Sequence, residues 1–522
     1  MSMSDVQGGP GQIGLGDAAQ DRAFFGHPRG LSTLFFSEMW ERFSYYGLRA
    51  LLILFMTASV ANGGMGLDVA TAGAVYGTYT AMVYLMSVPG GWLADKVFGQ
   101  RKAVLYGGVL IACGHFSLAV PVNGFFPLGL VLIVLGTGLL KPNISAMVGQ
   151  LYAAQDERRD AGFSIFYMGI NMGGFLGPLI TGYLAQNAGF RTMLEGWGMD
   201  PNNAWHWGFG AAGVGMTLGL IQYVRGGGTL GTAGVEAGGA PTTELATKFR
   251  KQALTYGAIA VVVLLLAAMA NATGIITVTP LLIRDVAGYS LLVITVVFFG
   301  MLFTDKSWTA QERGRLWIIF VFFVAVAIFW SVFDQAGSTL NLFADRNTEN
   351  TLFGFEFPSA WFQSLNSLFI IMFAPLFAMV WIKLGPRQPS SPVKFAMGLI
   401  GAAAGFWIMA LAAMQSGPGN TLVSPMWLVF VYLVHTWAEL CISPVGLSSM
   451  SKLAPAKIVG AMMGVWFLGA SVGNFFAGQM SAYYEEMSLV QLFGVVSLMP
   501  MIAGIIMYLC AKRITEMMGG VR

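Results

Sequence analysis

The chain has 522 residues, of which 56% are hydrophobic and 10% are charged, and its mean hydropathy is +0.67. Because a soluble protein carries roughly a quarter of its residues as charged side chains, this composition excludes a water-soluble globule and predicts a protein embedded in lipid. The net charge of +3 offers no electrostatic footprint for nucleic acid. The 3 cysteines lie in apolar stretches without ligand-like spacing, so we expect neither a disulfide framework nor a metal site.

Fourteen stretches are long and apolar enough to cross a bilayer as helices. Residues 1–30 are polar and Gly-rich, which predicts a cytoplasmic N-terminal tail without a signal peptide. A spanning helix needs about 20 mostly apolar residues, and this window predicts an all-α polytopic membrane protein. The predicted spans lie near residues 32–57, 73–94, 102–122, 126–149, 161–187, 206–225, 252–272, 286–303, 315–338, 359–383, 394–415, 423–446, 457–482 and 488–511.

These spans divide into two six-helix bundles and an inserted pair of helices. Residues 226–247 are rich in Gly, Thr and Ala and lack a periodic apolar face, which is typical of a flexible linker. The predicted domains are the tail at 1–30, an N-terminal bundle at 31–225, the linker at 226–250, a two-helix hairpin at 251–305 and a C-terminal bundle at 314–513.

The distribution of lysine and arginine predicts the orientation. When the chain is threaded from a cytoplasmic N-terminus, the basic residues of the connecting segments fall on the cytoplasmic side, except Arg191, Arg284 and Arg346. This is the positive-inside pattern, and it predicts that both termini are cytoplasmic. An odd number of helices in either half would destroy the pattern.

A short internal repeat relates the two halves. Lys141 in the fourth helix and Glu439 in the tenth are each followed, at the same spacing, by an isoleucine and a serine. If the halves are related by an axis along the membrane normal, this lysine and this glutamate face each other at one depth. The identity within the repeat is low, so a chance match is the alternative.

Charged side chains inside the predicted spans are the candidate site. A charge at a helix centre costs about 2.5–3.5 kcal/mol on insertion scales, which makes it a functional candidate by default. Glu38, Glu41, Arg42 and Arg49 lie on one stripe of the first helix, together with Tyr45. The simpler interpretation is that Glu38 and Arg42 form an i,i+4 ion pair that only anchors the helix.

Two carboxylates beside one arginine predict a proton switch. Burial and mutual repulsion favour protonation of one carboxyl group, while Arg42 keeps the other ionised. Arg49 offers a fork suited to a carboxylate, and Lys141 with Glu439 suits the two ends of a zwitterion. Asp334 in the seventh helix would pair with Arg49 as an outer latch, or else it is an acid exposed to water at a helix end.

Aromatic and amide side chains within the spans would line a pocket for variable groups of a ligand. Taken singly, each is also explained as a packed or hydrogen-bonded helix residue. The candidates are Tyr45, Tyr46, Tyr84, Asn171, Asn366 and Trp466.

The sequence contains no motif for enzymatic chemistry. There is no paired metal-ligand spacing, no Walker loop and no Gly-x-Ser-x-Gly elbow. The run from Gly91 to Lys102 follows no predicted strand, so it is interpreted as a helix-to-helix turn. We expect a carrier without a cofactor.

Several of these stretches resemble the motifs of a known family. Residues 38–47 match the first-helix E-x-x-E-R-F-x-Y-Y-G motif of the proton-dependent oligopeptide transporter (POT) family of the major facilitator superfamily. Residues 163–175 (FSIFYMGINMGGF) are similar to its fifth-helix signature, and residues 91–102 resemble the superfamily's loop motif. Residues 329–338 and 439–444 look like its seventh- and tenth-helix motifs.

The resemblance implies a bacterial inner-membrane symporter that imports di- and tripeptides with protons by alternating access, functional as a monomer among membrane lipids. It implies a role in proton coupling for Glu38, Glu41 and Arg42. The implied substrate-binding residues are Arg49, Tyr45, Tyr46, Tyr84, Lys141, Asn171, Asn366, Glu439, Ser443 and Trp466, and the implied gate residues are Arg49, Asp334, Lys141 and Glu439.

The chain departs from animal members of this family at one position. Those members carry a functional histidine in the second helix, where this sequence has Gly77. Proton coupling is then expected to depend on carboxylates, with the proton as coupling ion and without a histidine-like titration from that site.

Two other classes stay open. A carrier of the same fold would move another small anion or amphiphile, such as nitrate or a drug-like molecule. Glu38 and Glu41 favour the proton-coupled branch, and Lys141 with Glu439 favours a zwitterion. A membrane-embedded enzyme or a nutrient sensor is the third class.

Overall fold

The protein is built almost entirely from helices, because a backbone in lipid must satisfy its hydrogen bonds within its own segment. The computed structural model describes residues 21–122, 124–153, 155–235, 243–417, 421–455, 458 and 461–519. In these ranges the only sheet is the two-stranded hairpin of β1 (Thr351–Leu352) and β2 (Phe355–Glu356).

Each of the fourteen predicted spans overlaps a helix in the described ranges. The long helices are α2 (Arg29–Thr57), α3 (Val69–Leu85) with its continuation α4 (Ser87–Leu93), α5 (Gln100–Leu118), α6 (Phe125–Gln150), α7 (Arg158–Gln186), α9 (Ala204–Gly226), α10 (Thr243–Ala272), α11 (Pro280–Thr304), α12 (Ala310–Phe333), α14 (Gln363–Leu384), α15 (Ser391–Ser416), α16 (Met426–Leu453), α17 (Met462–Ser481) and α18 (Leu489–Met517). The short elements are α8 (Ala188–Gly196), α13 (Thr339–Arg346), η1 (Val60–Asn62), η2 (Ala94–Phe98), η3 (Pro201–Asn203), η4 (Gly227–Leu230), η5 (Asp334–Gly337), η6 (Ser359–Phe362), η7 (Gly385–Arg387) and η9 (Ala482–Tyr484).

Among the described residues, nine helical stretches have the length and apolarity of a membrane span. Helix α2 is not one of them because it carries Arg29, Glu38, Glu41, Arg42 and Arg49. The predicted all-α polytopic class is confirmed, and a count of fourteen spans is consistent with it.

Contacts group the chain into two compact units. The first comprises the residues up to Leu48 with Met86–Gly177 and His206–Val278, and the second comprises Arg49–Leu85, Pro178–Trp205 and the residues from Thr279 onward. The chain therefore passes from one unit to the other within α2, within α7 and near the start of α9. Because these units do not follow the predicted domain boundaries, the division into two six-helix bundles and a hairpin stays a prediction.

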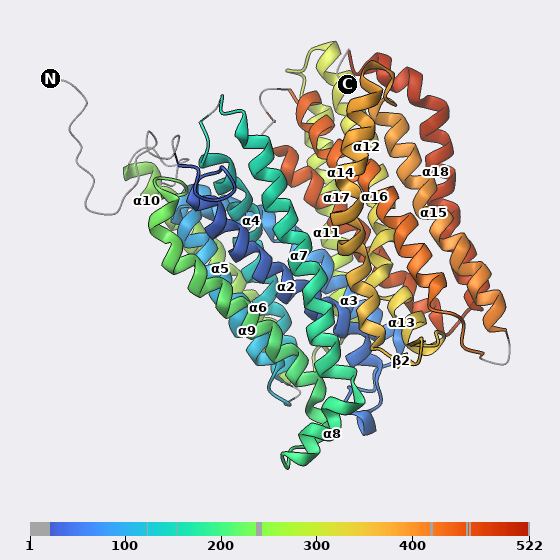
Figure 1. Ribbon diagram of the computed structural model, residues 1–522. Coiled ribbons are helices and arrows are strands. Elements are labelled where there is room, and N and C mark those ends of the chain that lie inside the picture. Colours follow the sequence, from blue (N-terminus) through green and yellow to red (C-terminus); the bar gives the residue numbers. More distant parts are fainter. Residues whose placement is uncertain are drawn as a thin grey trace. The chain divides into compact units, whose positions relative to one another are not determined.

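In the first unit, glycines bring α5 and α6 into close contact along their length (Figure 1). A Cβ atom on Gly107 would lie 2.6 Å from the carbonyl oxygen of Gly136, and a Cβ atom on Gly136 would lie equally close to that of Gly107. Gly114 and Gly129 repeat this arrangement near the other end of the pair. Small residues at helix interfaces are how backbones approach each other in lipid.

The segment predicted as a flexible linker is shorter than expected. Arg101 at the start of α5 donates from Nε to the carbonyl of Ala233 at 2.6 Å, and the amide of Gly234 donates to Gln150 Oε1 at 2.7 Å. These bonds hold the residues after η4 against the ends of α5 and α6. Helix α10 already begins at Thr243. Only residues 236–242, which lie outside the described residues, separate this helix from the residues that follow η4.

The last residues of the predicted N-terminal tail also fold against the first unit, whereas residues 1–20 lie outside the described part. His27 is buried, and its Nδ1 lies 2.9 Å from the hydroxyl oxygen of Tyr152. Arg158 donates to the carbonyl oxygens of Asp21 and Gly26, each at 3.2 Å. The segment 21–28 is therefore attached to the loop between α6 and α7.

In the second unit, α3 and α17 meet at Gly77 and Gly478. A Cβ atom on Gly77 would lie 2.8 Å from the Cα atom of Gly478 and 2.9 Å from the carbonyl oxygen of Phe475. A histidine at position 77 would therefore need these two backbones to separate. The absence of a side chain here has a packing reason, independent of how protons are coupled.

Acidification should loosen the segment 21–28. Burial and the Arg158 guanidinium hold the pKa of His27 below its usual value, so the folded state favours neutral imidazole. The resulting stabilisation is complete above the unfolded pKa of about 6.5 and is lost as the pH falls below it. Hydrogen exchange of residues 21–28, corrected for intrinsic rates, should be faster at pH 5.5 than at pH 7.5. In His27→Gln this difference should disappear, and a pH-independent wild type would contradict the expectation.

Gly77→Val should destabilise the protein by about 1–3 kcal/mol, because the added methyl groups overpack the α3–α17 contact. The measurement is the melting temperature of the purified protein in detergent. Gly300→Ala is the control, since no atom lies within 4 Å of its Cβ position on α11, and it should be neutral or slightly stabilising. Equal melting temperatures for Gly77→Val and the wild type would show that the contact is not tight.

Candidate functional site

The three charged residues at the centre of α2 form a buried cluster in the first unit. Glu38, Glu41 and Arg42 are at most 3% exposed. Arg42 Nε lies 3.2 Å from Glu38 Oε1 and makes a short hydrogen bond to Glu41 Oε2. Glu38 Oε2, Glu41 Oε1 and Arg42 Nη2 have no hydrogen-bond partner within the described ranges. One guanidinium is thus shared between two carboxylates, each of which keeps one oxygen available.

Lys141 and the tyrosines of α2 surround this cluster. Lys141 is on α6, and its ammonium group interacts electrostatically with Glu38. The guanidinium carbon of Arg42 lies 5.0 Å from the ring centroid of Tyr45, within the range of a cation–π contact. The rings of Tyr45 and Tyr46 are 5.3 Å apart in an edge-on arrangement. The cluster therefore has cationic and aromatic neighbours from two helices.

Arg49 lies further along α2 and belongs to the second unit. Its Nη2 is 2.8 Å from Oδ1 of Asp334, and both side chains are less than a tenth exposed. The two residues are 285 positions apart in the chain. The predicted pairing of these residues is present in the structure, and Asp334 is not an acid in water.

Glu439 on α16 accepts a hydrogen bond from an amide side chain. Asn366 Nδ2 donates to Glu439 Oε2 at 2.9 Å and to Thr436 Oγ1 at 3.1 Å. Asn366 was a pocket candidate, and its observed contact is with the carboxylate itself. His435, one turn away, instead has Nε2 3.1 Å from the carbonyl oxygen of Ala402. This imidazole therefore bonds to the backbone of α15.

The four remaining predicted residues each have different surroundings. Asn171 on α7 donates to the carbonyl of Tyr167 in its own helix at 2.9 Å. Tyr84 stacks at a tilt on Phe467, with 6.1 Å between ring centroids. Trp466 is buried on α17, and Ser443 has a buried hydroxyl without a hydrogen-bond partner among the described residues.

Lys141 belongs to the first unit and Glu439 to the second. Because the two residues belong to different units, it stays a prediction that Lys141 and Glu439 face each other at one depth. The same holds for the ligand contacts assigned to the predicted site residues.

Tyr76 on α3 is a site residue that the sequence did not indicate. Its hydroxyl accepts from Arg49 Nε at 2.9 Å and lies 3.4 Å from Asp334 Oδ2. A tyrosine in an apolar helix carries no charge and no motif position, so only the fold shows its place beside the ion pair.

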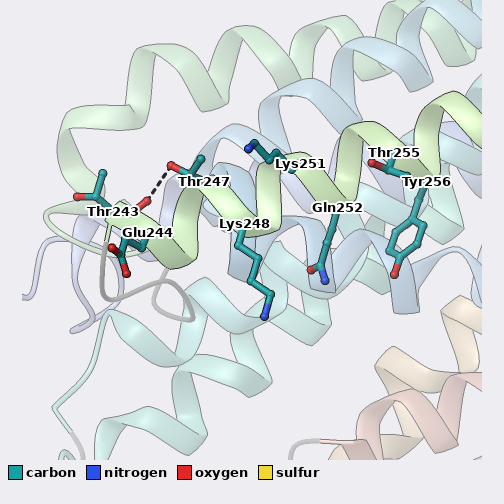
Figure 2. A pocket seen from close by; sticks show the side chains of 8 residues that line it. All are labelled: Thr243, Glu244, Thr247, Lys248, Lys251, Gln252, Thr255 and Tyr256. Atoms are coloured by element: carbon teal, nitrogen blue, oxygen red, sulfur yellow. Dashed lines mark hydrogen bonds between the residues drawn. The ribbon is translucent and has the colours of Figure 1, made fainter.

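A surface hollow lies elsewhere, along the first turns of α10. It has a volume of about 700 Å³. Figure 2 shows the side chains that line it, all from this one helix: Thr243, Glu244, Thr247, Lys248, Lys251, Gln252, Thr255 and Tyr256. None of the predicted site residues lines it. A ligand pocket needs polar groups that converge from several elements, so we do not assign the candidate site to this hollow.

The described residues contain no group of three or more His, Cys, Asp or Glu side chains that could hold a metal ion. The buried charges and the polytopic helical fold together define a multi-pass membrane carrier of the major facilitator type. The chain belongs to the POT family, whose sequence pattern matches residues 101–499. Members of this family are transporters, and the protein is not an enzyme.

Known relatives cover nearly the whole chain. A peptide transporter of Yersinia enterocolitica is 44% identical over 89% of this chain and 89% of its own length. A di-/tripeptide transporter of Lactococcus lactis is 36% identical over 96% of this chain and 99% of its own. The crystal structure of a POT peptide transporter in complex with sulfate has a TM-score of 0.88 and 42% identity, covering 97% of this chain and 100% of that one.

Removing one member of the Arg49–Asp334 pair should destabilise the protein more than removing both. Asp334→Leu leaves an uncompensated buried guanidinium, which costs about 3–5 kcal/mol. Replacing both residues with apolar ones of similar size removes the stranded charge and should restore part of the loss. Melting temperatures of Asp334→Leu, Arg49→Leu and Arg49→Leu/Asp334→Leu test this. Additive losses in the double variant would mean that the two groups do not interact.

Proposed function

We propose that this protein is a proton-coupled symporter that imports di- and tripeptides by alternating access. The observation that carries the proposal is the buried cluster in which Glu38 and Glu41 share Arg42. Two of its relatives are a peptide transporter and a di-/tripeptide transporter, which supports peptides as the cargo.

The proton step follows from the charge balance of the cluster. With both carboxylates ionised, the single guanidinium of Arg42 is shared between two negative charges. Lys141 also interacts electrostatically with Glu38, but burial still disfavours the second ionised carboxylate. Binding of one proton leaves a neutral carboxyl group and one ion pair. Because Arg42 then binds a single carboxylate, the geometry of its contacts changes. A proton shifts the equilibrium between two states of the carrier when it binds them with different free energies.

The cargo step uses the charges at the two ends of a peptide. We assign the peptide carboxylate to Lys141 and Arg49, because cations with several N–H donors recognise carboxylates. Arg49 is bound to Asp334 in this structure, so it becomes available to a ligand only after that pair opens. Glu439 binds the peptide ammonium group. Asn366 orients the carboxylate of Glu439 by donating a hydrogen bond to it.

The predicted membrane context completes the proposal. The distribution of Lys and Arg supports cytoplasmic termini in an inner membrane, and the two relatives described above are bacterial proteins. We propose that the protein functions as a monomer surrounded by lipid, with the proton as its only coupling ion.

An imposed inward proton gradient should drive accumulation of labelled dialanine in liposomes that contain the purified protein. Unlabelled tripeptides should compete, whereas nitrate should not. Equal uptake with and without the gradient would refute proton coupling. Competition by nitrate alone would favour the anion carrier.

Two substitutions separate proton coupling from cargo binding. Glu41→Gln should abolish gradient-driven accumulation but retain counterflow exchange of dialanine, because it removes a proton site and preserves the shape of the side chain. Lys141→Ala should reduce both activities about 10-fold or more, as expected from the loss of a hydrogen bond to a charged group. Counterflow is the control that Glu41→Gln is folded, and a melting temperature equal to that of the wild type is the control for Lys141→Ala. Full activity of Lys141→Ala would remove this residue from the site.

A further inference from the structure

The 3₁₀ turn η5 (Asp334–Gly337) continues α12, and all four of its residues are buried. A 3₁₀ turn at the end of a helix leaves backbone carbonyls that need partners outside the helix. The carbonyl oxygen of Asp334 accepts from the Tyr76 hydroxyl at 3.3 Å and lies 3.5 Å from Arg49 Nη2. The turn therefore offers both a side-chain carboxylate and a backbone oxygen to the same two partners.

The other side of the turn is held by the C-terminal helices. The carbonyl oxygen of Ala336 accepts a short hydrogen bond from Gln363 Nε2 on α14 and a second from the Tyr432 hydroxyl on α16 at 3.3 Å. Gln363 also donates to the Tyr432 hydroxyl at 2.9 Å. These two donors and η5 all lie in the predicted C-terminal bundle, whereas Arg49 and Tyr76 lie in the predicted N-terminal bundle.

Gly337 allows Arg49 and Tyr76 to reach the turn. A Cβ atom at this position would lie 2.8 Å from Arg49 Nε and closer still to the Tyr76 hydroxyl oxygen. Gly337 does not have a positive φ angle. Gly337 is therefore required for close approach and not for backbone conformation.

We propose that Tyr76 and Gly337 are positioning residues of the Arg49–Asp334 gate, acting only when that gate is closed. Tyr76 bridges the guanidinium and the aspartate, and Gly337 leaves the space in which its hydroxyl sits. Gln363 and Tyr432 keep η5 in place from the C-terminal side, so Asp334 stays available for re-closure after Arg49 and Tyr76 have left. This inference rests on the proposed alternating access.

The two residues should show compensation, because they compete for one space. Tyr76→Phe removes the bridging hydroxyl. It should raise the ratio of open to closed gate about five-fold, which corresponds to the loss of about 1 kcal/mol of hydrogen bonding. Gly337→Ala pushes the hydroxyl and guanidinium away and should raise the ratio further. In Tyr76→Phe/Gly337→Ala the clash with the hydroxyl is gone, so the ratio should be lower than the product of the two single effects.

The ratio is measured by spin-label distance distributions in the full-length protein in liposomes. Labels on Ala61→Cys and Glu349→Cys, both at exposed positions in the second unit, report separation of the α2–α3 loop from the segment after α13. The native cysteines at positions 113, 441 and 510 are replaced by serine. Tyr508→Phe and Gly300→Ala are the matched controls, since Tyr508 is exposed and Gly300 has open space around it. Neither should change the distribution.

Multiplicative effects in the double variant, or an unchanged distribution for Tyr76→Phe, would overturn the inference. Because Tyr76→Phe adds no atoms, it tests the hydroxyl even if Gly337→Ala fails to fold. Dialanine uptake by the same samples separates this inference from the proposed function. A wild type that shows both distances but no gradient-driven uptake would refute proton-coupled peptide transport and leave the gate assignment standing.

Discussion

The structure depends on the neutralisation of charges that helix α2 carries into an apolar environment. A buried ion is stable only when a partner of opposite charge and further hydrogen bonds replace its water. Arg42 forms ion pairs with Glu38 and Glu41, and Asp334 forms an ion pair with Arg49. Because the partner of Arg49 lies on a distant segment, this requirement also connects α2 to the end of α12. Charge compensation thereby decides which helices must meet.

The two buried groups differ in a way that suits different tasks. The cluster of Glu38, Glu41 and Arg42 is contained within two turns of one helix, so its internal distances survive rigid movement of that helix. The Arg49–Asp334 pair joins segments 285 positions apart, so relative movement of those segments must break it. The first arrangement suits a group that titrates, and the second suits a contact that opens and closes. This division agrees with the roles proposed for them.

The helical fold and the buried charged residues could be predicted from the sequence, because charge and periodicity are local signals. The stripe at positions 38, 41, 42 and 49 follows from helical geometry, and Asp334 was a rare buried acid available to Arg49. Tyr76 could not be found in this way, since its role depends on the packing of α3 near η5. Asn366 and Asn171 stay predicted pocket residues, and only the fold shows that Asn366 donates to Glu439 and that Asn171 donates to its own helix.

The predicted linker shows the limit of composition as a guide. Gly-rich sequence at 226–235 suggested flexibility, yet Arg101 and Gln150 bind its backbone atoms. Glycine exposes carbonyl and amide groups, which makes such a segment a good partner for long polar side chains. Whether a Gly-rich stretch is ordered therefore depends on donors and acceptors far away in the chain, such as the ends of α5 and α6.

Helix α10 differs from all of these elements, because none of its 30 residues is buried. Most of its side chains face the surroundings of the protein. Much of its apolar portion therefore has to remain hydrophobic and helical, but it does not have to fit against other helices. Such a segment should diverge in sequence faster than the other spans while keeping its length. It is also a convenient place to attach a rigid fusion partner or a fluorophore, because little of the interior would be disturbed.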